Sequence, residues 1–271
     1  MAYREFQPHP LLRPYIDAYW VMKGDKPTAE GQRIYPDGCI DIIYNLGGDF
    51  LSDSGTYTMR NETVYLVGTM LRYKDITREL NTTLLGIRFK PLGFPTFFQF
   101  ASLHEITEKT IEFGRKQLPD IRELDEDTLT LLDKFFCSRL PSRLNSLFPL
   151  MDTILINKGI ISINKLAKLH FITPRQLERN FKKDLGASPK EFTNFIRYQH
   201  AMQLIGKKLY SESLLDVALD AGFYDHAHLT NEIKKYSGIL PSQLQNVGFF
   251  QTAIIPPPVA LSMKKRDHRI R

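Results

Sequence analysis

The hydrophobic pattern changes character along the chain. In residues 1–100, short runs of β-branched and aromatic residues alternate with turn signals, and the clearest strand-like runs cover residues 33–45, 63–68 and 83–89. A Pro-Asp-Gly turn interrupts the first of these runs. Over residues 95–140, apolar residues recur at spacings of three and four, which predicts helices. The N-terminal part is therefore expected to be β-rich with flanking helices.

The last third of the chain contains one pattern twice. The first copy covers residues 162–183 and the second covers residues 213–235. Each reads as a short helix, a tight turn and a second helix that begins at a capping residue and ends in paired lysines. This order is typical of a helix-turn-helix, whose second helix lies in a major groove of DNA. Two copies in one chain predict a monomer that reaches two segments of groove by itself.

The second helix of the first copy has a clear start and two distinct faces. Thr173 is the predicted N-cap, Pro174 follows at the first helical position and Gln176 at the third, which is a capping-box pattern. Leu177 and Phe181 share one face at i, i+4 spacing and should point to the core. The residues left to contact DNA are Thr173, Arg175, Glu178, Arg179 and Lys182.

The second copy follows the same plan. Gly222 lies where the turn needs a left-handed backbone, and Asp225 is the predicted N-cap of the next helix. Leu229 and Ile233 mark the face that should be buried. The candidates for the groove are His226, Ala227, Thr230 and Asn231.

Charge supports a polyanionic partner without establishing one. The chain has a formal net charge of +6, and residues 1–149 carry 18 Lys and Arg against 20 Asp and Glu, whereas residues 150–271 carry 18 against 10. A neutral-to-acidic front and a basic back suit a sensing part joined to a nucleic-acid-binding part. Part of the contrast lies in residues 249–271, which hold five basic residues and one acidic residue and read as a basic flexible tail.

Several kinds of site and location are disfavoured by composition. Cys39 and Cys137 offer no disulfide framework and no CxxC metal pattern, which fits a reducing cytoplasm. No apolar run approaches the roughly 20 residues of a membrane span, and the N-terminus lacks the apolar stretch of a signal peptide. His226 and His228 stand at i, i+2 and do not share a helix face. We therefore expect a cytoplasmic protein with no metal, no cofactor and no membrane partner.

A run of matching residues then connects the two copies to a known family. The matches are Leu166-Ala167, Arg175-x-Leu177-x-Arg179-x-Phe181-Lys182, Gly186-x-Ser188-Pro189, Arg197, Ala201, Asp216-Val-Ala218, Gly222-Phe223-x-Asp225 and Lys234. With this spacing, residues 160–244 resemble the AraC/XylS family of bacterial transcription regulators. The resemblance implies two helix-turn-helix units joined by a long helix and bound to double-stranded DNA. It implies contacts through Arg175, Glu178 and Arg179 and through His226, Ala227 and Asn231.

The second unit departs from the family pattern. His226-Ala-His-Leu229 replaces the usual run of Ser or Gln followed by Ser-His-Phe, Asn231 stands where Arg is common, and Ile233 replaces a usual Phe. Gly238-Ile-Leu-Pro241 replaces Gly-x-Ser-Pro. Losing an Arg removes a contact worth roughly 1–3 kcal/mol of discrimination when it is bidentate to a base. We therefore expect the first unit to dominate specificity.

The front of the chain also resembles the sensor-type domain that precedes this DNA-binding unit in some regulators. The resemblance rests on Tyr35-Pro-Asp-Gly-Cys-Ile-Asp-Ile and Leu85-Gly-Ile-Arg-Phe-Lys-Pro91. It implies a β-rich fold and names no effector. The candidate effector-binding residues are Tyr19, Trp20, Tyr35 and Tyr44, and the alternative for this aromatic group is a place in the core.

Together these features predict an α+β protein in three segments. They are a sensing or dimerisation domain over residues 1–143, a double helix-turn-helix domain over 144–248 and a tail over 249–271. The expected function is sequence-specific regulation of transcription, with activation as the working assignment. RNA polymerase and a small-molecule effector of unknown identity are the expected partners besides DNA. A homodimer is compatible with the sequence, and the helical stretch 125–140 is where its contact would be sought.

Two other functions remain open at this point. A nonspecific architectural protein would bind DNA without preferring a site, and its affinity would fall equally for every sequence as salt rises. A DNA alkylation-repair enzyme would need a four-cysteine zinc site, which two cysteines cannot build. We therefore expect no enzymatic activity.

Overall fold

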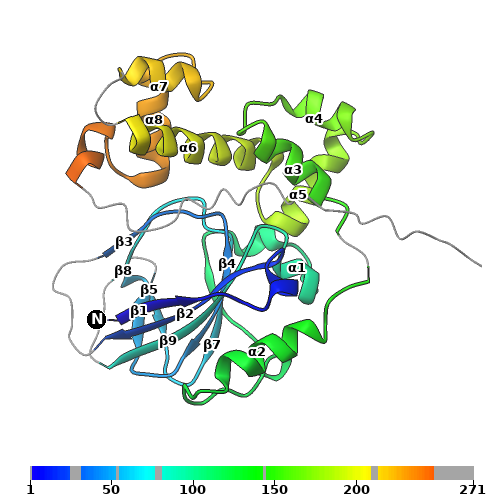
Figure 1. Cartoon of the computed structure of the whole chain (residues 1–271), viewed down its shortest axis with the longest axis vertical. Coiled ribbons are helices and arrows are strands. Elements are labelled where there is room, and N and C mark those ends of the chain that lie inside the picture. The colour runs from blue at the N-terminus through cyan, green and yellow to red at the C-terminus, as the bar shows by residue number, and fades with distance from the viewer. Residues whose placement is uncertain are drawn as a thin grey trace, which may run out of the picture.

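The computed structural model combines a β-rich N-terminal part with a helical C-terminal part, which is the α+β class predicted (Figure 1). It describes residues 2–24, 32–52, 55–76, 81–142, 145–208 and 213–246. The predicted boundary between residues 143 and 144 and the predicted tail lie outside these residues. Within them, no helix has the length and apolar character needed to cross a membrane.

A six-stranded antiparallel sheet forms the centre of the N-terminal part. In spatial order its strands are β1 (Ala2–Phe6), β2 (Ile16–Gly24), β9 (Thr82–Phe89), β4 (Ile40–Asn45), β7 (Val64–Val67) and β10 (Thr110–Glu112). Two small sheets accompany it: β3 (Gln32–Ile34) pairs with β8 (Lys74–Ile76), and β5 (Phe50–Ser52) pairs with β6 (Tyr57–Met59). The central strands bury side chains on both faces.

The predicted run over residues 33–45 forms two strands that do not pair with each other. β3 pairs with β8, whereas β4 pairs with β9 and β7 in the main sheet. The physical reason lies in β4, where Ile42 packs into one apolar cluster and Ile43 into another on the opposite face. A strand that is buried on both faces belongs in the middle of a sheet. The Pro-Asp-Gly turn therefore carries the chain from one sheet to another.

The helical prediction for residues 95–140 is wrong for most of that range. The structure has a one-turn helix α1 (Phe94–Phe97), the 3-10 turns η3 (Leu103–Ile106) and η4 (Arg115–Gln117), strand β10 and one longer helix, α2 (Thr128–Cys137). Gly114 and Pro119 interrupt the apolar spacing, and both residues disfavour a helix interior. The spacing in between reflects apolar residues that pack singly onto the sheet.

Helix α2 is held against the sheet by aromatic packing. Leu132 and Phe136 are fully buried. The ring of Phe136 meets Phe89 at 5.6 Å and Phe97 at 5.0 Å between centroids, both edge to face. Edge-to-face pairs of this kind add to the free energy gained from apolar burial. This packing fixes α2 on the sheet together with η1 (Pro10–Leu12), whose Leu12 is also buried.

The C-terminal part is built around one long helix, α6 (Pro189–Lys208). Figure 1 shows α6 extending from the group α3–α5 to the pair α7 and α8, above the sheet. The other elements are α3 (Phe148–Ile156), α4 (Ile163–Leu169), α5 (Pro174–Leu185), α7 (Leu214–Asp220), α8 (His226–Ser237) and the 3-10 turn η5 (Pro241–Asn246). α4–α5 and α7–α8 are the two predicted helix-turn-helix units.

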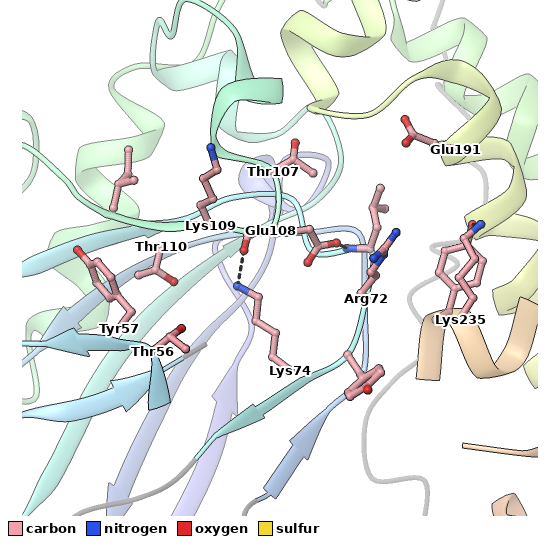
Figure 2. Close-up of a pocket in the computed structure, with 14 residues that line it drawn as sticks. Thr56, Tyr57, Arg72, Lys74, Thr107, Glu108, Lys109, Thr110, Glu191 and Lys235 are labelled. Atoms are coloured by element: carbon pink, nitrogen blue, oxygen red, sulfur yellow. Dashed lines mark hydrogen bonds between the residues drawn. The ribbon is translucent and has the colours of Figure 1, made fainter. Parts of the chain in front are cut away.

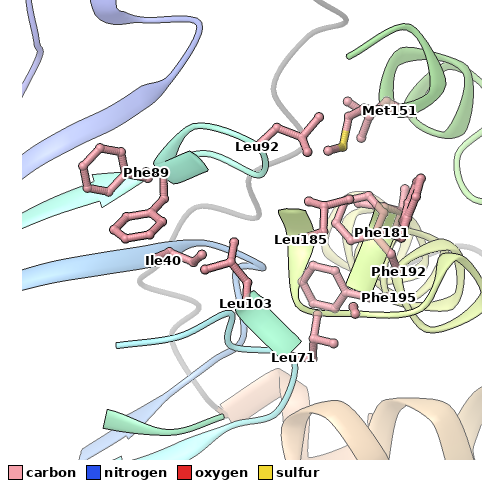
Figure 3. Packing of buried hydrophobic residues seen from close by; sticks show 14 of the residues in the cluster. Ile40, Leu71, Phe89, Leu92, Leu103, Met151, Phe181, Leu185, Phe192 and Phe195 are labelled. Atoms are coloured by element: carbon pink, nitrogen blue, oxygen red, sulfur yellow. The ribbon is translucent and has the colours of Figure 1, made fainter. Parts of the chain in front are cut away.

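The two parts share one continuous apolar core. Leu71 and Leu103 from the N-terminal part lie in the same buried cluster as Leu185 and Phe195 from the helices (Figure 3). The free energy gained by burying apolar surface is roughly proportional to the area removed from water. The N-terminal part and the C-terminal helices are therefore held in contact by the same force that stabilises each of them.

One buried side chain in α6 opposes this stability. Gln199 is 2% exposed, and neither its amide nitrogen nor its amide oxygen has a hydrogen-bond partner among the described residues. We predict that Gln199→Met raises the free energy of unfolding by about 1 kcal/mol, because the desolvation penalty of an unpaired amide is removed at similar volume. Urea unfolding followed by circular dichroism measures this change.

The matched control is Gln203→Met on the same helix, where the side chain is only half-buried. This variant should leave stability nearly unchanged, because a solvated amide has no such penalty. A lower stability of Gln199→Met than of the wild type would contradict the prediction.

Candidate nucleic-acid interface

Helix α5 begins and ends as its sequence predicts. The extended N-cap Thr173 accepts a hydrogen bond from the backbone amide of Gln176 at 3.2 Å through its hydroxyl, and Pro174 follows at the first helical position. Leu177 and Phe181 are completely buried. At the other end, Gly186 has a left-handed backbone with φ of 80°, which an L side chain rarely adopts.

Helix α8 is built in the same way. The Asp225 carboxylate accepts a hydrogen bond from the amide of His228 at 2.7 Å, and Gly238 ends the helix with φ of 74°. Leu229 and Ile233 are completely buried, as predicted. The first helix of this unit also has a full capping box between Ser213 and Asp216. Each unit thus presents a capped second helix with one packed face.

The outer face of α5 carries free positive charge. Arg175 and Arg179 are exposed, and neither forms a salt bridge with a described residue. Glu178 and Lys182 pair with each other at 3.1 Å at i, i+4 spacing. Thr173 is exposed beside them. All five predicted residues therefore lie on or next to one outward face, with the two arginines free to meet an anion.

The outer face of α8 is more neutral. His226, Ala227 and Asn231 are exposed, whereas Thr230 is half-buried and its hydroxyl donates to the carbonyl oxygen of His226 at 2.8 Å. His228 packs edge-to-face on Phe223 with 5.2 Å between ring centroids. The four predicted residues share the first turns of the helix, but they supply no arginine or lysine.

Helix α6 joins the two units. Its 20 residues correspond to about 30 Å at 1.5 Å per residue, which is close to one turn of B-form DNA. Arg197 fixes the second unit on it, because its guanidinium donates to the carbonyl of Gly222 at 3.2 Å and lies 4.6 Å above the ring of Phe223. Sequence reasoning gave Arg197 no role, although its place in the family pattern was a signal.

The N-terminal part contacts the C-terminal end of α5. The hydroxyl of Thr69 donates to the carbonyl of Leu185 at 2.6 Å, and that of Thr107 donates to the carbonyl of Gly186 at 2.7 Å. The Nδ1 atom of His104 lies 2.9 Å from the same Gly186 oxygen. Carbonyls at a helix end lack partners within the helix, so these contacts satisfy them.

The same part of the molecule contacts the end of α8. The amide of Tyr73 donates to the carbonyl of Tyr236 at 3.0 Å, and Arg33 reaches the carbonyl of Ser237 at 3.4 Å. Arg33 is held by a two-bond contact to Asp75, at 2.8 and 2.9 Å. The acceptors are backbone atoms, which every residue has, so no motif in the helices could have indicated these contacts.

Most of the aromatic residues predicted for an effector lie in the core. Tyr19 and Tyr44 are 1% exposed, and their hydroxyls donate to Asp133 at 2.9 Å and to the carbonyl of Pro119 at 3.1 Å. Trp20 is buried in the cluster on the opposite face of the sheet. Tyr35 is half-buried near Arg33. The four do not surround one cavity in the described residues, which favours the core alternative left open by the sequence.

Trp20 lies beside a buried ionic cluster. Its indole nitrogen donates to Asp41 at 2.6 Å, and the Arg88 guanidinium is within 4 Å of four carboxylates, which belong to Glu5, Asp17, Asp37 and Asp41. Burial raises the pKa of Asp41 to about 7, and the neighbouring Arg88 charge opposes that rise. One buried cation thus lies near four carboxylates, so ionising all four carboxylates at once costs free energy.

Cys39 lies next to this cluster and is buried. Burial raises the pKa of its thiol well above the ordinary value, and the nearby Asp37 charge adds to the rise. A nucleophilic cysteine needs a stabilised thiolate. Cys39 therefore has the properties of a small buried side chain.

Comparison with known proteins finds a family model that matches each part of the chain. The family described as "Helix-turn-helix domain" matches residues 166–246, and "Domain of unknown function (DUF6597)" matches residues 4–112. The "HTH-type transcriptional regulator MtrA" of Neisseria gonorrhoeae is 33% identical over 87 residues, which are 32% of this chain and 28% of that protein. The "Lactose operon transcription activator" of Staphylococcus xylosus is 32% identical over 87 residues, which are 32% of this chain and 30% of that protein.

The similarity thus covers less than a third of the length of either relative. Among solved structures, ToxT from Vibrio cholerae aligns with 83% of this chain and 97% of its own, at 10% identity and a TM-score of 0.45. The relatives matched by sequence are named as regulators of transcription.

The ionic cluster predicts a pH dependence of stability. Because the pKa of Asp41 is raised in the folded state, the folded protein holds a proton there that the unfolded chain has lost, and stability falls as pH rises from about 4 to 7. Asp41→Asn removes this loss. We predict that the stability of the variant relative to the wild type increases from pH 5 to pH 7, by at most about 1.4 kcal/mol per pH unit.

Urea unfolding of both proteins at pH 5, 6 and 7 measures this difference. The amide oxygen of Asn can still accept the indole bond of Trp20, so the fold should be kept. A difference that stays constant across this range, or that decreases with pH, would contradict the assignment.

Proposed function

We propose that this chain, which carries an AraC-type helix-turn-helix domain in residues 166–246, is a sequence-specific DNA-binding regulator of transcription. The observation that carries the proposal is the pair α5 and α8. Both are capped second helices with an exposed outer face, and both pack on α6, whose 20 residues correspond to a length of about 30 Å, close to one turn of B-form DNA. A single chain is thereby suited to two successive major-groove segments.

The two helices would contribute unequally to DNA binding. Arg175 and Arg179 are free cations on α5, and arginine contacts guanine bidentately or phosphate by charge. Thr173, Glu178 and Lys182 lie around them. On α8, the contacts would come from His226, Ala227, Thr230 and Asn231, which offer three polar side chains, one methyl group and little formal charge. Affinity and most of the specificity would therefore depend on α5.

The proposal extends to the organisation of the whole chain. Residues 1–143 would sense a small-molecule effector or a partner, residues 144–248 would bind DNA, and residues 249–271 would form a basic tail. We further propose that the protein acts in the cytoplasm, without enzymatic activity, and activates transcription through RNA polymerase. Where two chains associate, exposed parts of α2 such as Leu131 would supply the contact.

Nonspecific architectural binding is the second candidate. The exposed arginines favour it as much as specific binding, because charge alone supplies nonspecific affinity. The neutral outer face of α8 favours sequence-specific binding, because a protein that binds any DNA sequence gains most affinity from charge on both helices. Selection of sequences therefore distinguishes the two functions.

We predict that selection from a random duplex pool at physiological salt returns a motif with two half-elements about one helical turn apart. Arg175→Ala/Arg179→Ala should lose the half-element read by α5 and at least tenfold in affinity for the selected site, because bidentate base contacts are removed. If an arginine contacts only phosphate, its replacement would instead reduce the slope of log affinity against log salt concentration by about one and leave the motif intact.

The matched control is Arg13→Ala/Arg122→Ala, which removes the same charge from exposed positions of the N-terminal part. It should keep the motif and nearly all of the affinity. If the wild type and residues 144–248 alone both return no motif, the regulator proposal fails and nonspecific binding stands. If only the fragment returns a motif, the N-terminal part restrains the helices.

A further inference from the structure

A cavity lies where the N-terminal part meets helices α6 and α8 (Figure 2). Its volume is about 660 Å³, within the roughly 300 to 1,000 Å³ of small-molecule sites. Residues 56–57, 71–74 and 107–111 form the wall on the N-terminal part. Glu191 at the start of α6, with Lys235 and Tyr236 at the end of α8, forms the opposite wall. A ligand in this cavity would touch both parts of the chain.

Positive side chains predominate around the cavity. Arg72, Lys74 and Lys109 belong to the N-terminal wall, and Lys235 belongs to the opposite one. The exposed guanidinium of Arg72 forms no salt bridge with a described residue. Lys235 pairs with Glu232 at 3.3 Å, and the Lys235 side chain of this pair is 41% exposed, so water weakens the interaction. Arg72 and Lys235 carry charge of the same sign on opposite walls, and an anion between them would offset their repulsion.

The two carboxylates of the lining are engaged elsewhere. Glu108 accepts a hydrogen bond from the amide of Leu71 at 2.7 Å, and Glu191 accepts one from the amide of Ser188 at 2.8 Å. Both side chains thus hold turns of the backbone in place. The ammonium groups of Lys74 and Lys109 also donate to backbone carbonyls, those of Glu108 at 3.1 Å and Glu105 at 3.0 Å, so Arg72 and Lys235 are the cations best placed to meet a ligand.

The remaining lining is apolar and aromatic. Leu71 and Ile111 contribute aliphatic surface, and Tyr57, Tyr73 and Tyr236 contribute rings. Burial raises the pKa of Tyr236, so its hydroxyl remains protonated and can donate a hydrogen bond. A ligand that suits this cavity combines a negatively charged group with an apolar body.

The cavity also shares residues with the contacts that hold the recognition helices. Tyr73 lines it and donates its amide to the carbonyl of Tyr236 at the end of α8. Thr107 lines it and donates to the carbonyl of Gly186 at the end of α5. The walls of the cavity are therefore also elements that contact the ends of both helices.

We propose that this cavity is a binding site for a small organic anion, with the charged group between Arg72 and Lys235 and the apolar body against Tyr73 and Tyr236. The bound anion strengthens the contact between the N-terminal part and α8 and thereby changes the affinity for DNA. The second statement rests on the proposed function, whereas the first does not.

Isothermal titration calorimetry of the full chain with three probes tests the site. Phenylacetate and phenyl phosphate carry a carboxylate and a phosphate on similar bodies, and phenylacetamide is a neutral analogue. We expect the anions to bind at one site per chain and phenylacetamide to bind at least tenfold more weakly. Arg72→Gln and Lys235→Gln should each weaken anion binding about tenfold, the loss expected when a charge-assisted contact is removed.

Lys116→Gln is the control, because it removes a charge at an exposed position outside the cavity. It should bind both anions as the wild type does. Failure of both anions to bind, equal binding of phenylacetamide, or unchanged affinity in the two cavity variants would each overturn the site. The preferred anion shows whether the natural ligand is a carboxylate or a phosphate.

The coupling to DNA is measured separately, as affinity for the selected duplex with and without the anion that binds better. We expect a change of fivefold or more in the wild type, and none in Arg72→Gln at the same probe concentration. If the anion binds but the affinity for DNA does not change, the proposed coupling is wrong and the proposed binding site stands. Absence of any selected duplex would overturn the proposed function, while the calorimetry would still decide the site.

Discussion

The fixed mounting of two helices on a third is the constraint on which the rest of the structure depends. A protein that inserts α5 and α8 into successive grooves has to hold them about one turn of DNA apart, and α6 supplies that length. The holding contacts are concrete. Arg197 binds the turn of the second unit, and Phe181 and Phe192 pack the first unit against the start of α6. Each unit is too small to bury its own core, so docking on α6 is also what folds it.

The second constraint is the set of contacts by which the N-terminal part holds helices α5 and α8. It contacts the last carbonyls of both recognition helices, through Thr69 and Thr107 at α5 and through Tyr73 and Arg33 at α8. The outer faces of the helices stay free, because the grip is confined to their C-terminal ends. Hydrogen bonds to backbone carbonyls are geometrically strict, so a small displacement at this interface alters the position of a whole helix. That is a physical route from the front of the chain to DNA.

Buried polar groups in both parts of the chain carry a different cost. The buried Arg88 lies beside several carboxylates in the N-terminal part, and Gln199 in α6 has an amide without a hydrogen-bond partner among the described residues. Buried polar groups of this kind lower stability compared with apolar packing. In the N-terminal part, Trp20 donates a hydrogen bond to Asp41 beside Arg88. The cavity lies elsewhere, at the interface with helices α6 and α8.

The sequence by itself determined the local structure of the DNA-binding helices. Thr173, Asp225, Gly186 and Gly238 cap them through interactions within a few residues, and the i, i+4 pairs mark the packed face, so spacing was enough to predict them. Tertiary structure alone decided the rest. Which strands pair, and that β3 and β4 do not, depends on the burial of both faces of β4. The contacts with α5 and α8 and the cavity beside them use backbone carbonyls and residues that are far apart in the chain, such as Thr69 and Leu185, which are separated by 116 positions. Such contacts follow from how the surfaces pack, and no local spacing encodes them.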